Sequence, residues 1–446
     1  MVGALQSDWW DAFLRALLLR DANTIWVVFG VLSLGIASGT VGAFLVLRRR
    51  ALTADAISHA TLPGIAIAFM VMLAVGFSGK SLVGLLLGAY LAGLAAMVVL
   101  VLIRRTTHLQ DDAAIGITLS VFFGVGICLL SFVQQLPTGN AAGLETFIFG
   151  KAATMLSADA SLIGIASLFV VVVVALFFKE LGALCFDEGW AAARGWPVLG
   201  LDFMLTGLVV LVTVLAIQSV GLVLAIALLI IPASTAMLWS QRLSVVVLLS
   251  ALMGGFGAWL GAMISASIPR MPTGPVIVLV CAVLFFASLL FGRRGVLQRW
   301  ISRAALARRV DRQHLLRACW EIMEQDGGSE VGLDRLLHWR SWSRRRVGVV
   351  LRRCVRGGLL ERGDGGCIRF TESGRRRATQ VVRNHRLWEA YLIHHADIAP
   401  THVDRDADAI EHVLDADLIR SLESVLGTAA GAVPSSPHTI GGEGRA

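Results

Sequence analysis

Residues 51–69 read ALTADAISHATLPGIAIAF and place a carboxylate, an imidazole and a proline inside an apolar run. Asp55 and His59 are four positions apart, so both side chains lie on one face of an α-helix. Pro63 has no backbone N–H, so the carbonyl oxygen of His59, four positions earlier, receives no helical hydrogen bond. Ionisable groups at membrane depth are costly and usually line a path or a site.

Charge divides the chain into two parts. Of its 446 residues 56% are hydrophobic and 16% charged, whereas an ordinary soluble domain carries about 25% charged residues. Residues 1–300 hold 16 Lys+Arg and 12 Asp+Glu, whereas 301–446 hold 23 and 19. The six cysteines form no CxxC pair, which argues against a structural zinc site. We expect four parts in order: membrane domain 1–298, linker 299–310, soluble domain 311–426 and flexible tail 427–446.

The first part contains nine apolar runs near the length, about 20 residues, that a helix needs to cross a bilayer. They lie at roughly 25–47, 57–77, 81–103, 113–133, 160–178, 198–217, 221–239, 243–268 and 276–291. If the arginines at 48–50 face the cytoplasm, the loops on their side hold ten Lys+Arg and the opposite loops five. The positive-inside rule therefore predicts an all-α multi-pass protein with its N-terminus outside and its C-terminal domain in the cytoplasm.

The pair Asp55 and His59 has two interpretations from spacing alone. With the freed carbonyl beside them, the two side chains would suit a divalent cation, as in the broken helices of transporters. Alternatively, Asp55 caps the helix in the headgroup region and His59 bonds a neighbouring carbonyl. If Asp55 holds a metal at mid-membrane, the helix around 51–63 must be displaced or broken.

Nothing in the sequence predicts an ATP site. The stretch AVGFSGKS at 74–81 has alanine where a phosphate-binding loop needs its first glycine, and no strand precedes it. Any ATP energy must therefore come from another subunit, and we expect no enzymatic activity in this chain.

Six motifs carry a family resemblance along the first 295 residues or so. They are FLVLRRRALTADAISHATLPGIAIAF, DDAAIGITLSVFFGVGICLLS, GLETFIFGKAATMLSADA, CFDEGWAAARGWPV, VGLVLAIALLIIPAS and MPTGPVIVL. In this order they closely resemble the permease subunit of bacterial ABC importers for zinc, manganese or iron. The resemblance implies that Asp55 and His59 form the intramembrane metal site. It also implies a cytoplasmic ATPase subunit, an extracytoplasmic metal-binding protein, and a homodimer or heterodimer of permeases in the bacterial cell membrane.

The loop FDEGWAAARG at 186–195 resembles the segment that docks on the ATPase in that family, and its amphipathic spacing suits a short docking helix. Glycine at position 189 replaces a bulkier residue of the usual FDPEFARALG, and we expect it to weaken the helix locally. The residues expected to dock are Phe186, Asp187, Trp190, Ala193 and Gly195.

After Arg299 the pattern is that of a soluble domain with a wing. A helix at 312–325 is followed by the helical stretches GLDRLLHWR and SRRRVGVVLRRCVRGG and the hairpin-like LLERGDGGCIRFTESG, which predicts a winged-helix-like α(+β) domain. Thirteen arginines lie from Arg335 to Arg377, against three acidic residues. Such a face would neutralise the phosphates of DNA or lie on anionic membrane lipid, and a solvated helix face is the third alternative.

The stretches VVRNHRLWEAYL and VDRDADAIEHVL resemble the diphtheria toxin repressor family of metal-sensing regulators, over about 311–426. The metal ligands that this resemblance implies are His385, Glu389, Asp404, Asp408, Glu411 and His412. Asp404 stands where a histidine is usual in that family. Without the resemblance, such side chains on amphipathic helices are more often solvent-facing.

These observations predict the permease subunit of an ATP-driven importer of Mn, Zn or Fe with a cytoplasmic metal-responsive tail. The metal ion would be the substrate and an effector of the tail, which would inhibit import by linkage between two sites. We expect no permanently bound cofactor. The alternatives are a membrane-tethered, metal-responsive DNA-binding regulator and an ion-coupled secondary metal transporter, and the docking loop disfavours the latter.

Overall fold

The computed structural model describes residues 22–76, 81–135, 155–268, 271–339, 342–363, 366–395, 419–422 and 434. The chain divides into two compact units, Met1–Gln298 and Arg299–Ala446. Of the expected flexible tail, 427–446, only Pro434 is among the described residues.

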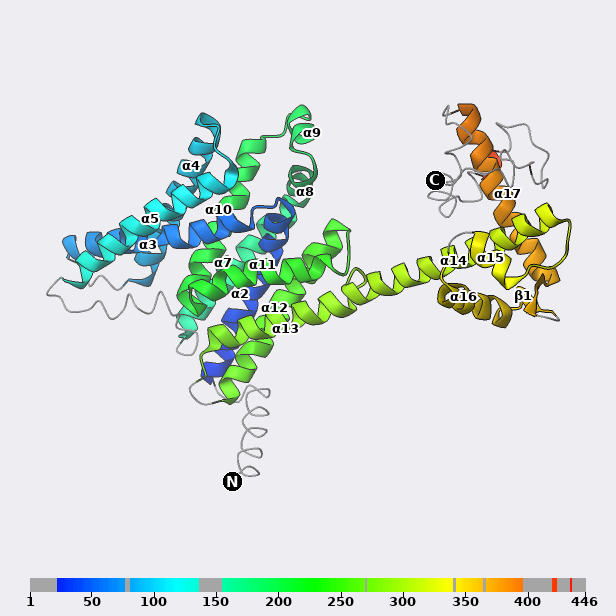
Figure 1. The fold of residues 1–446 in the computed structure, drawn as a ribbon. Coiled ribbons are helices and arrows are strands. Elements are labelled where there is room, and N and C mark those ends of the chain that lie inside the picture. The colour runs from blue at the N-terminus through cyan, green and yellow to red at the C-terminus, as the bar shows by residue number, and fades with distance from the viewer. Residues whose placement is uncertain are drawn as a thin grey trace, which may run out of the picture. The chain divides into compact units, whose positions relative to one another are not determined.

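Apolar helices make up the first unit (Figure 1). In its described residues eight helices are long and apolar enough to cross a membrane, and a ninth, α11 (Leu222–Met237), is shorter. The candidate spans are α2 (Ala22–Leu47), α3 (Ala51–Ala74), α4 (Leu82–Thr106), α5 (Asp111–Gln134), α7 (Ser157–Leu176), α10 (Val198–Val220), α12 (Leu243–Ser267) and α13 (Thr273–Phe291). Helices satisfy their own backbone hydrogen bonds, as a segment in lipid must.

The seventh expected span, 221–239, corresponds to α11 and is shorter in the structure than predicted. Gly221, with a φ of +90°, separates α10 from α11. Glycine adopts this left-handed region without the steric cost that a Cβ brings. α10 therefore continues to Val220, and α11 holds 16 residues, about 24 Å of helix at 1.5 Å per residue.

Small residues on α2 allow it to pack closely against α11 and α12. A Cβ on Gly39 would lie 2.7 Å from the backbone carbon of Ser250 in α12, and the Ser250 hydroxyl donates to the Gly39 carbonyl at 2.6 Å. Gly42 lies equally tightly against the backbone of Leu229 in α11. Close approach of backbones is how helices associate where lipid supplies no hydrophobic drive.

A second group of helices carries the expected transport residues. Figure 1 shows α3, α4 and α5 side by side, with α3 running across the direction of α2. α3 begins at Ala51 and remains helical through Pro63. α3 is therefore not broken at Pro63. The chain changes direction before α3 begins, at the loop 48–50 between α2 and α3.

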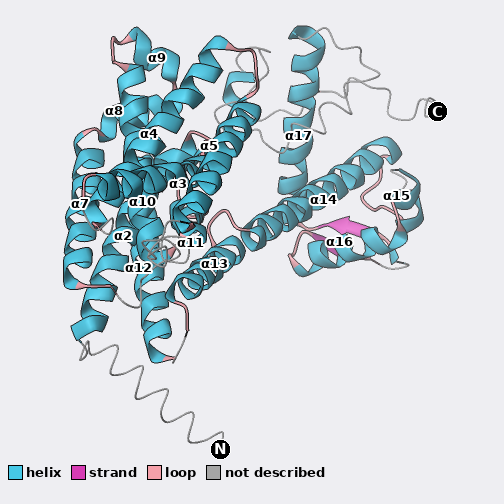
Figure 2. Cartoon of the chain, turned by 90° about the vertical axis from the view of Figure 1, so that its left-hand side faces the viewer, coloured by secondary structure: helices cyan, strands magenta, loops and turns pink. Residues whose placement is uncertain are grey.

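The second unit is a helical domain with one small sheet, as predicted (Figure 2). Its elements are α14 (Val296–Asp326), α15 (Leu333–Trp339), α16 (Arg344–Arg356), β1 (Leu360–Arg362), β2 (Ile368–Phe370) and α17 (Glu372–His395). β1 and β2 are antiparallel, with Leu360 opposite Phe370. The residues 299–310, expected as a linker, are helical and belong to α14. The core buries side chains of α14, α15, α16 and both strands.

Candidate functional site

Asp55 and His59 lie in the first turns of α3 and face one another. The Nε2 atom of His59 is 3.6 Å from Oδ1 of Asp55, which exceeds the usual hydrogen-bond distance. The two side chains are 39% and 23% exposed, respectively, so both remain accessible. The one-face arrangement predicted from the spacing is therefore present, with the proline four residues beyond His59.

Helix α5 closes one side of this pair. The ring of Phe123 meets that of His59 edge to face, with centroids 5.1 Å apart. One helical turn further on, a Cβ on Gly126 would lie 2.9 Å from Cδ of Pro63, so the missing side chain lets α5 approach α3 at the proline. Sequence reasoning did not single out these two α5 residues, although their i,i+3 spacing within DDAAIGITLSVFFGVGICLLS was the available signal.

The donor atoms of the pair suit a divalent cation. Nδ1 of His59 is buried and has no hydrogen-bond partner among the described residues, while Nε2 faces the Asp55 carboxylate. Carboxylate oxygen and imidazole nitrogen are both ligands of Mn, Fe and Zn, and geometry and availability decide among them.

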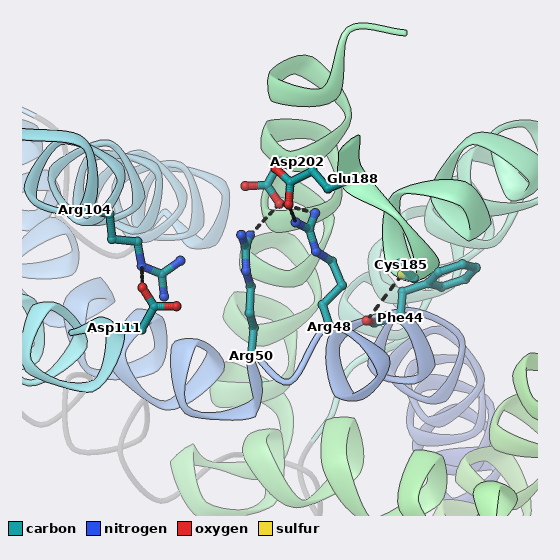
Figure 3. A network of polar contacts seen from close by, with 8 residues as sticks. All are labelled: Phe44, Arg48, Arg50, Arg104, Asp111, Cys185, Glu188 and Asp202. Carbon is teal, nitrogen blue, oxygen red and sulfur yellow. Dashed lines mark hydrogen bonds and ion pairs between the residues drawn. The ribbon is translucent and has the colours of Figure 1, made fainter. Parts of the chain in front are cut away.

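A buried arginine network lies at the end of the first unit where α3 begins (Figure 3). Arg48 donates from Nη1 to Oδ1 of Asp202 at 2.6 Å and from Nη2 to Oε2 of Glu188 at 3.1 Å. Arg50 donates to the same Asp202 oxygen at 2.5 Å. The side chains of Arg48 and Asp202 are 5% and 13% exposed, so the charge-assisted bond between them is desolvated, whereas the Glu188 side chain is 59% exposed. We call these four residues the arginine network.

The arginine network connects three separate segments. Arg48 and Arg50 belong to the loop between α2 and α3, Asp202 to the first turns of α10, and Glu188 to the short helix α9 (Glu188–Ala193). Beside it a cavity of about 510 Å³ is lined by the loop 47–50 and by residues of α3, α4, α5, α8 (Phe178–Phe186) and α9. Asp202 is 154 positions from Arg48 and 152 from Arg50, so no helical spacing in the sequence relates it to them.

Cys185 in α8 lies beside the arginine network as a neutral thiol. Its thiol is 3.8 Å from the carbonyl oxygen of Phe44, and burial raises its pKa to about 11. The thiol therefore stays protonated near neutral pH and packs as a small apolar group.

The expected docking residues lie at the same end of the unit. Asp187 caps α9 by accepting a hydrogen bond from the backbone N–H of Trp190 at 2.8 Å, and the helix forms despite Gly189. Phe186 and Trp190 are exposed, and α9 ends before Gly195, whose φ is +79°. Together they present apolar surface next to the arginine network.

The tail residues have two different outcomes. His385 and Glu389 lie on α17, both at most 3% exposed, with Nε2 and Oε1 3.0 Å apart. The other four expected ligands, Asp404, Asp408, Glu411 and His412, lie outside the described residues. Among the residues that the structure describes, no group of three or more His, Cys, Asp or Glu side chains could hold a metal ion.

Comparison with known proteins identifies both units. The ABC 3 transport family matches residues 20–292, and the iron dependent repressor, metal binding and dimerisation domain matches residues 371–433. The manganese transport system membrane protein MntC of Bacillus subtilis (strain 168) is 36% identical over 392 residues, covering 87% of this chain and 88% of that protein. The zinc transport system membrane protein TroC of Treponema pallidum (strain Nichols) is 46% identical over 288 residues, 64% of this chain and 95% of that protein. The solved structure of PsaBC from Streptococcus pneumoniae in complex with Fab has a TM-score of 0.56 at 30% identity, covering 68% of this chain and 100% of that one.

Proposed function

Because the chain belongs to the ABC 3 transport family, we propose that it is the membrane-spanning subunit of an ATP-driven importer of divalent metal ions. Relatives named for manganese and zinc transport support this substrate class. ATP is hydrolysed in a separate cytoplasmic subunit, and a metal-binding protein outside the bacterial cell membrane delivers the ion. The permease works as a homodimer or heterodimer.

Asp55 and His59 hold the ion during its passage. The observation that carries this assignment is the accessible carboxylate–imidazole pair on α3, in which Nε2 of His59 faces the Asp55 carboxylate at 3.6 Å. Two protein ligands from one helix bind an ion loosely enough for release, whereas closed sets of four or more ligands suit permanent structural sites. The carbonyl oxygen of His59, freed by Pro63, supplies a third ligand group.

The arginine network transmits movement between the ATPase and this site. In the predicted topology its end of the bundle faces the cytoplasm, where the exposed Phe186 and Trp190 dock on the ATPase. A displacement of α9 acts on Glu188, then on Arg48, and through Arg48 on the loop from which α3 begins. Alternating access then follows from rotation of α3 with its ligands.

The second unit serves as a cytoplasmic regulatory tail. Its match to a metal-binding repressor domain supports a response to metal, and the same match supports DNA binding as a second candidate function. Truncation after residue 299 separates these roles. If the tail mediates feedback, the truncate keeps importing at internal metal concentrations that inhibit the full chain; unchanged inhibition excludes feedback. Metal-dependent and salt-dependent binding of the full chain to a defined DNA sequence supports the second function.

Uptake in proteoliposomes that contain the ATPase and the binding protein tests the transport site. We expect Asp55→Ala and His59→Ala each to abolish uptake of Mn²⁺ and Zn²⁺ without lowering the amount of assembled complex. His108→Ala, in an exposed loop, is the matched control and keeps wild-type uptake. Normal uptake in either α3 variant overturns the assignment.

A further inference from the structure

We propose that the guanidinium of Arg317 occupies the cation position beside His385 and Glu389, so that this pair joins two helices of the tail without binding a metal ion. The pair is the described part of the ligand set implied by the repressor resemblance. The inference concerns the tail alone and does not depend on the transport function.

The three side chains form one buried cluster between α14 and α17. Nη1 of Arg317 lies 2.6 Å from Nδ1 and 2.8 Å from Nε2 of His385, and Nε2 lies 3.0 Å from Oε1 of Glu389. All three residues are at most 3% exposed. A cation, the guanidinium of Arg317, therefore already lies against the imidazole, and the Glu389 carboxylate faces Nε2.

The guanidinium of Arg317 blocks the approach of a metal ion to both ring nitrogens of His385. A guanidinium only donates and an ionised carboxylate only accepts. Nη1 of Arg317 lies within 2.8 Å of both ring nitrogens of His385, and the carboxylate of Glu389 faces Nε2. A metal ion would have to approach a ring nitrogen to about 2.0–2.2 Å, and the guanidinium already lies within 2.8 Å of both nitrogens.

Charge and burial keep Arg317 in this place. Its Nε also pairs with Glu321 at 3.0 Å, so the guanidinium bridges the imidazole and a carboxylate of its own helix. Arginine is effectively never deprotonated, so a divalent ion entering the cluster would meet an undiminished positive charge at short range. The neighbouring Leu316 and Ala318 are buried as well, so this part of α14 lies inside the core of the second unit.

A second arginine contact joins the same two helices, and here the arginine belongs to α17 and its partner to α14. Arg386 of α17 donates from Nη1 to Oε1 of Glu324 in α14 at 3.2 Å, and to the carbonyl of Pro434 at 3.1 Å. One arginine thus reaches from each helix to the other. The two helices are held together by protein cations, and any metal response of the tail rests on the expected ligands outside the described residues.

Binding of Mn²⁺ to the full chain in detergent tests this proposal. The Asp55→Ala/His59→Ala chain serves as the background, because it lacks the transport site, and electron paramagnetic resonance counts bound ions. Arg317→Gln removes the charge, and Arg317→Lys is the matched control that keeps it. Glu389→Gln is combined with each, and circular dichroism reports whether every variant is folded.

We expect Glu389→Gln to leave the number of bound Mn²⁺ ions unchanged while Arg317 is present. Arg317→Gln should gain one equivalent, Arg317→Lys should gain none, and the gain should vanish in Arg317→Gln/Glu389→Gln. Loss of an equivalent on Glu389→Gln in the presence of Arg317 overturns the proposal, and so does a folded Arg317→Gln chain that gains none. If Arg317→Gln does not fold, the Glu389→Gln comparison with Arg317 present decides by itself, and His385→Gln repeats it.

Discussion

Replacing Asp202 with asparagine removes the carboxylate that accepts from both Arg48 and Arg50. The two guanidinium groups then keep their charges with a neutral amide oxygen in place of an anion. Breaking a fully buried ion pair from one side costs about 3–5 kcal/mol. Arg50 is partly exposed, Arg48 keeps its bond to Glu188, and the amide still accepts, so we expect about 2–3 kcal/mol here.

The functional effect follows if the arginine network forms in only one conformation of the transport cycle. A loss of about 2–3 kcal/mol then shifts the conformational equilibrium about 30- to 150-fold. We expect Asp202→Asn to retain ATP hydrolysis in the assembled complex while metal uptake per ATP falls, because the movement of α9 no longer reaches α3. Uptake and hydrolysis measured in the same proteoliposomes give this ratio.

Two comparisons make the reasoning refutable. Asp111→Asn breaks an ion pair with Arg104 at 3.2 Å in which the carboxylate is 69% exposed, and pairs with so exposed a partner are worth about 0–1 kcal/mol. Arg50→Gln added to Asp202→Asn should restore part of the lost stability, because it removes the charge that paired with the Asp202 carboxylate. Unchanged uptake per ATP in Asp202→Asn, or an equal loss in Asp111→Asn, would refute the coupling role.

Three further predictions test packing and burial. Gly39→Ala should lower the free energy of unfolding by about 1–3 kcal/mol, because the new Cβ meets the backbone of α12. Gly116→Ala is the control, because a Cβ there has open space, and it should leave the free energy of unfolding unchanged. Thermal unfolding in detergent measures both variants. Gly126→Ala should raise the metal concentration needed for half-maximal uptake by separating α5 from α3, and Gly124→Ala, in open space, should leave it unchanged. Cys319, whose pKa burial raises to about 12, should resist thiol reagents at pH 8. The stability that this buried thiol contributes is present below its unfolded pKa of about 9 and falls as pH rises from there towards 12, as a pH series of chemical denaturation would show.

The sequence by itself determined the division of the chain and both family resemblances. Hydropathy marks the membrane helices because each must present about 20 apolar residues to lipid, a local property of the chain. The matches to the ABC 3 transport family and to the repressor domain confirm the two resemblances. The shared face of Asp55 and His59 was also predictable, since i,i+4 neighbours meet within one helix.

Only the tertiary structure decided which distant side chains meet. Arg48 and Asp202 are separated by 154 positions and Arg317 and His385 by 68, so no helical period relates them. Their meeting depends on how whole helices pack, down to the glycines that let backbones touch. The sequence therefore predicted a transport pair and a tail metal pair from helical spacing together with the two family resemblances. The fold placed the first pair beside α5 at the start of α3, and it placed an arginine against the second.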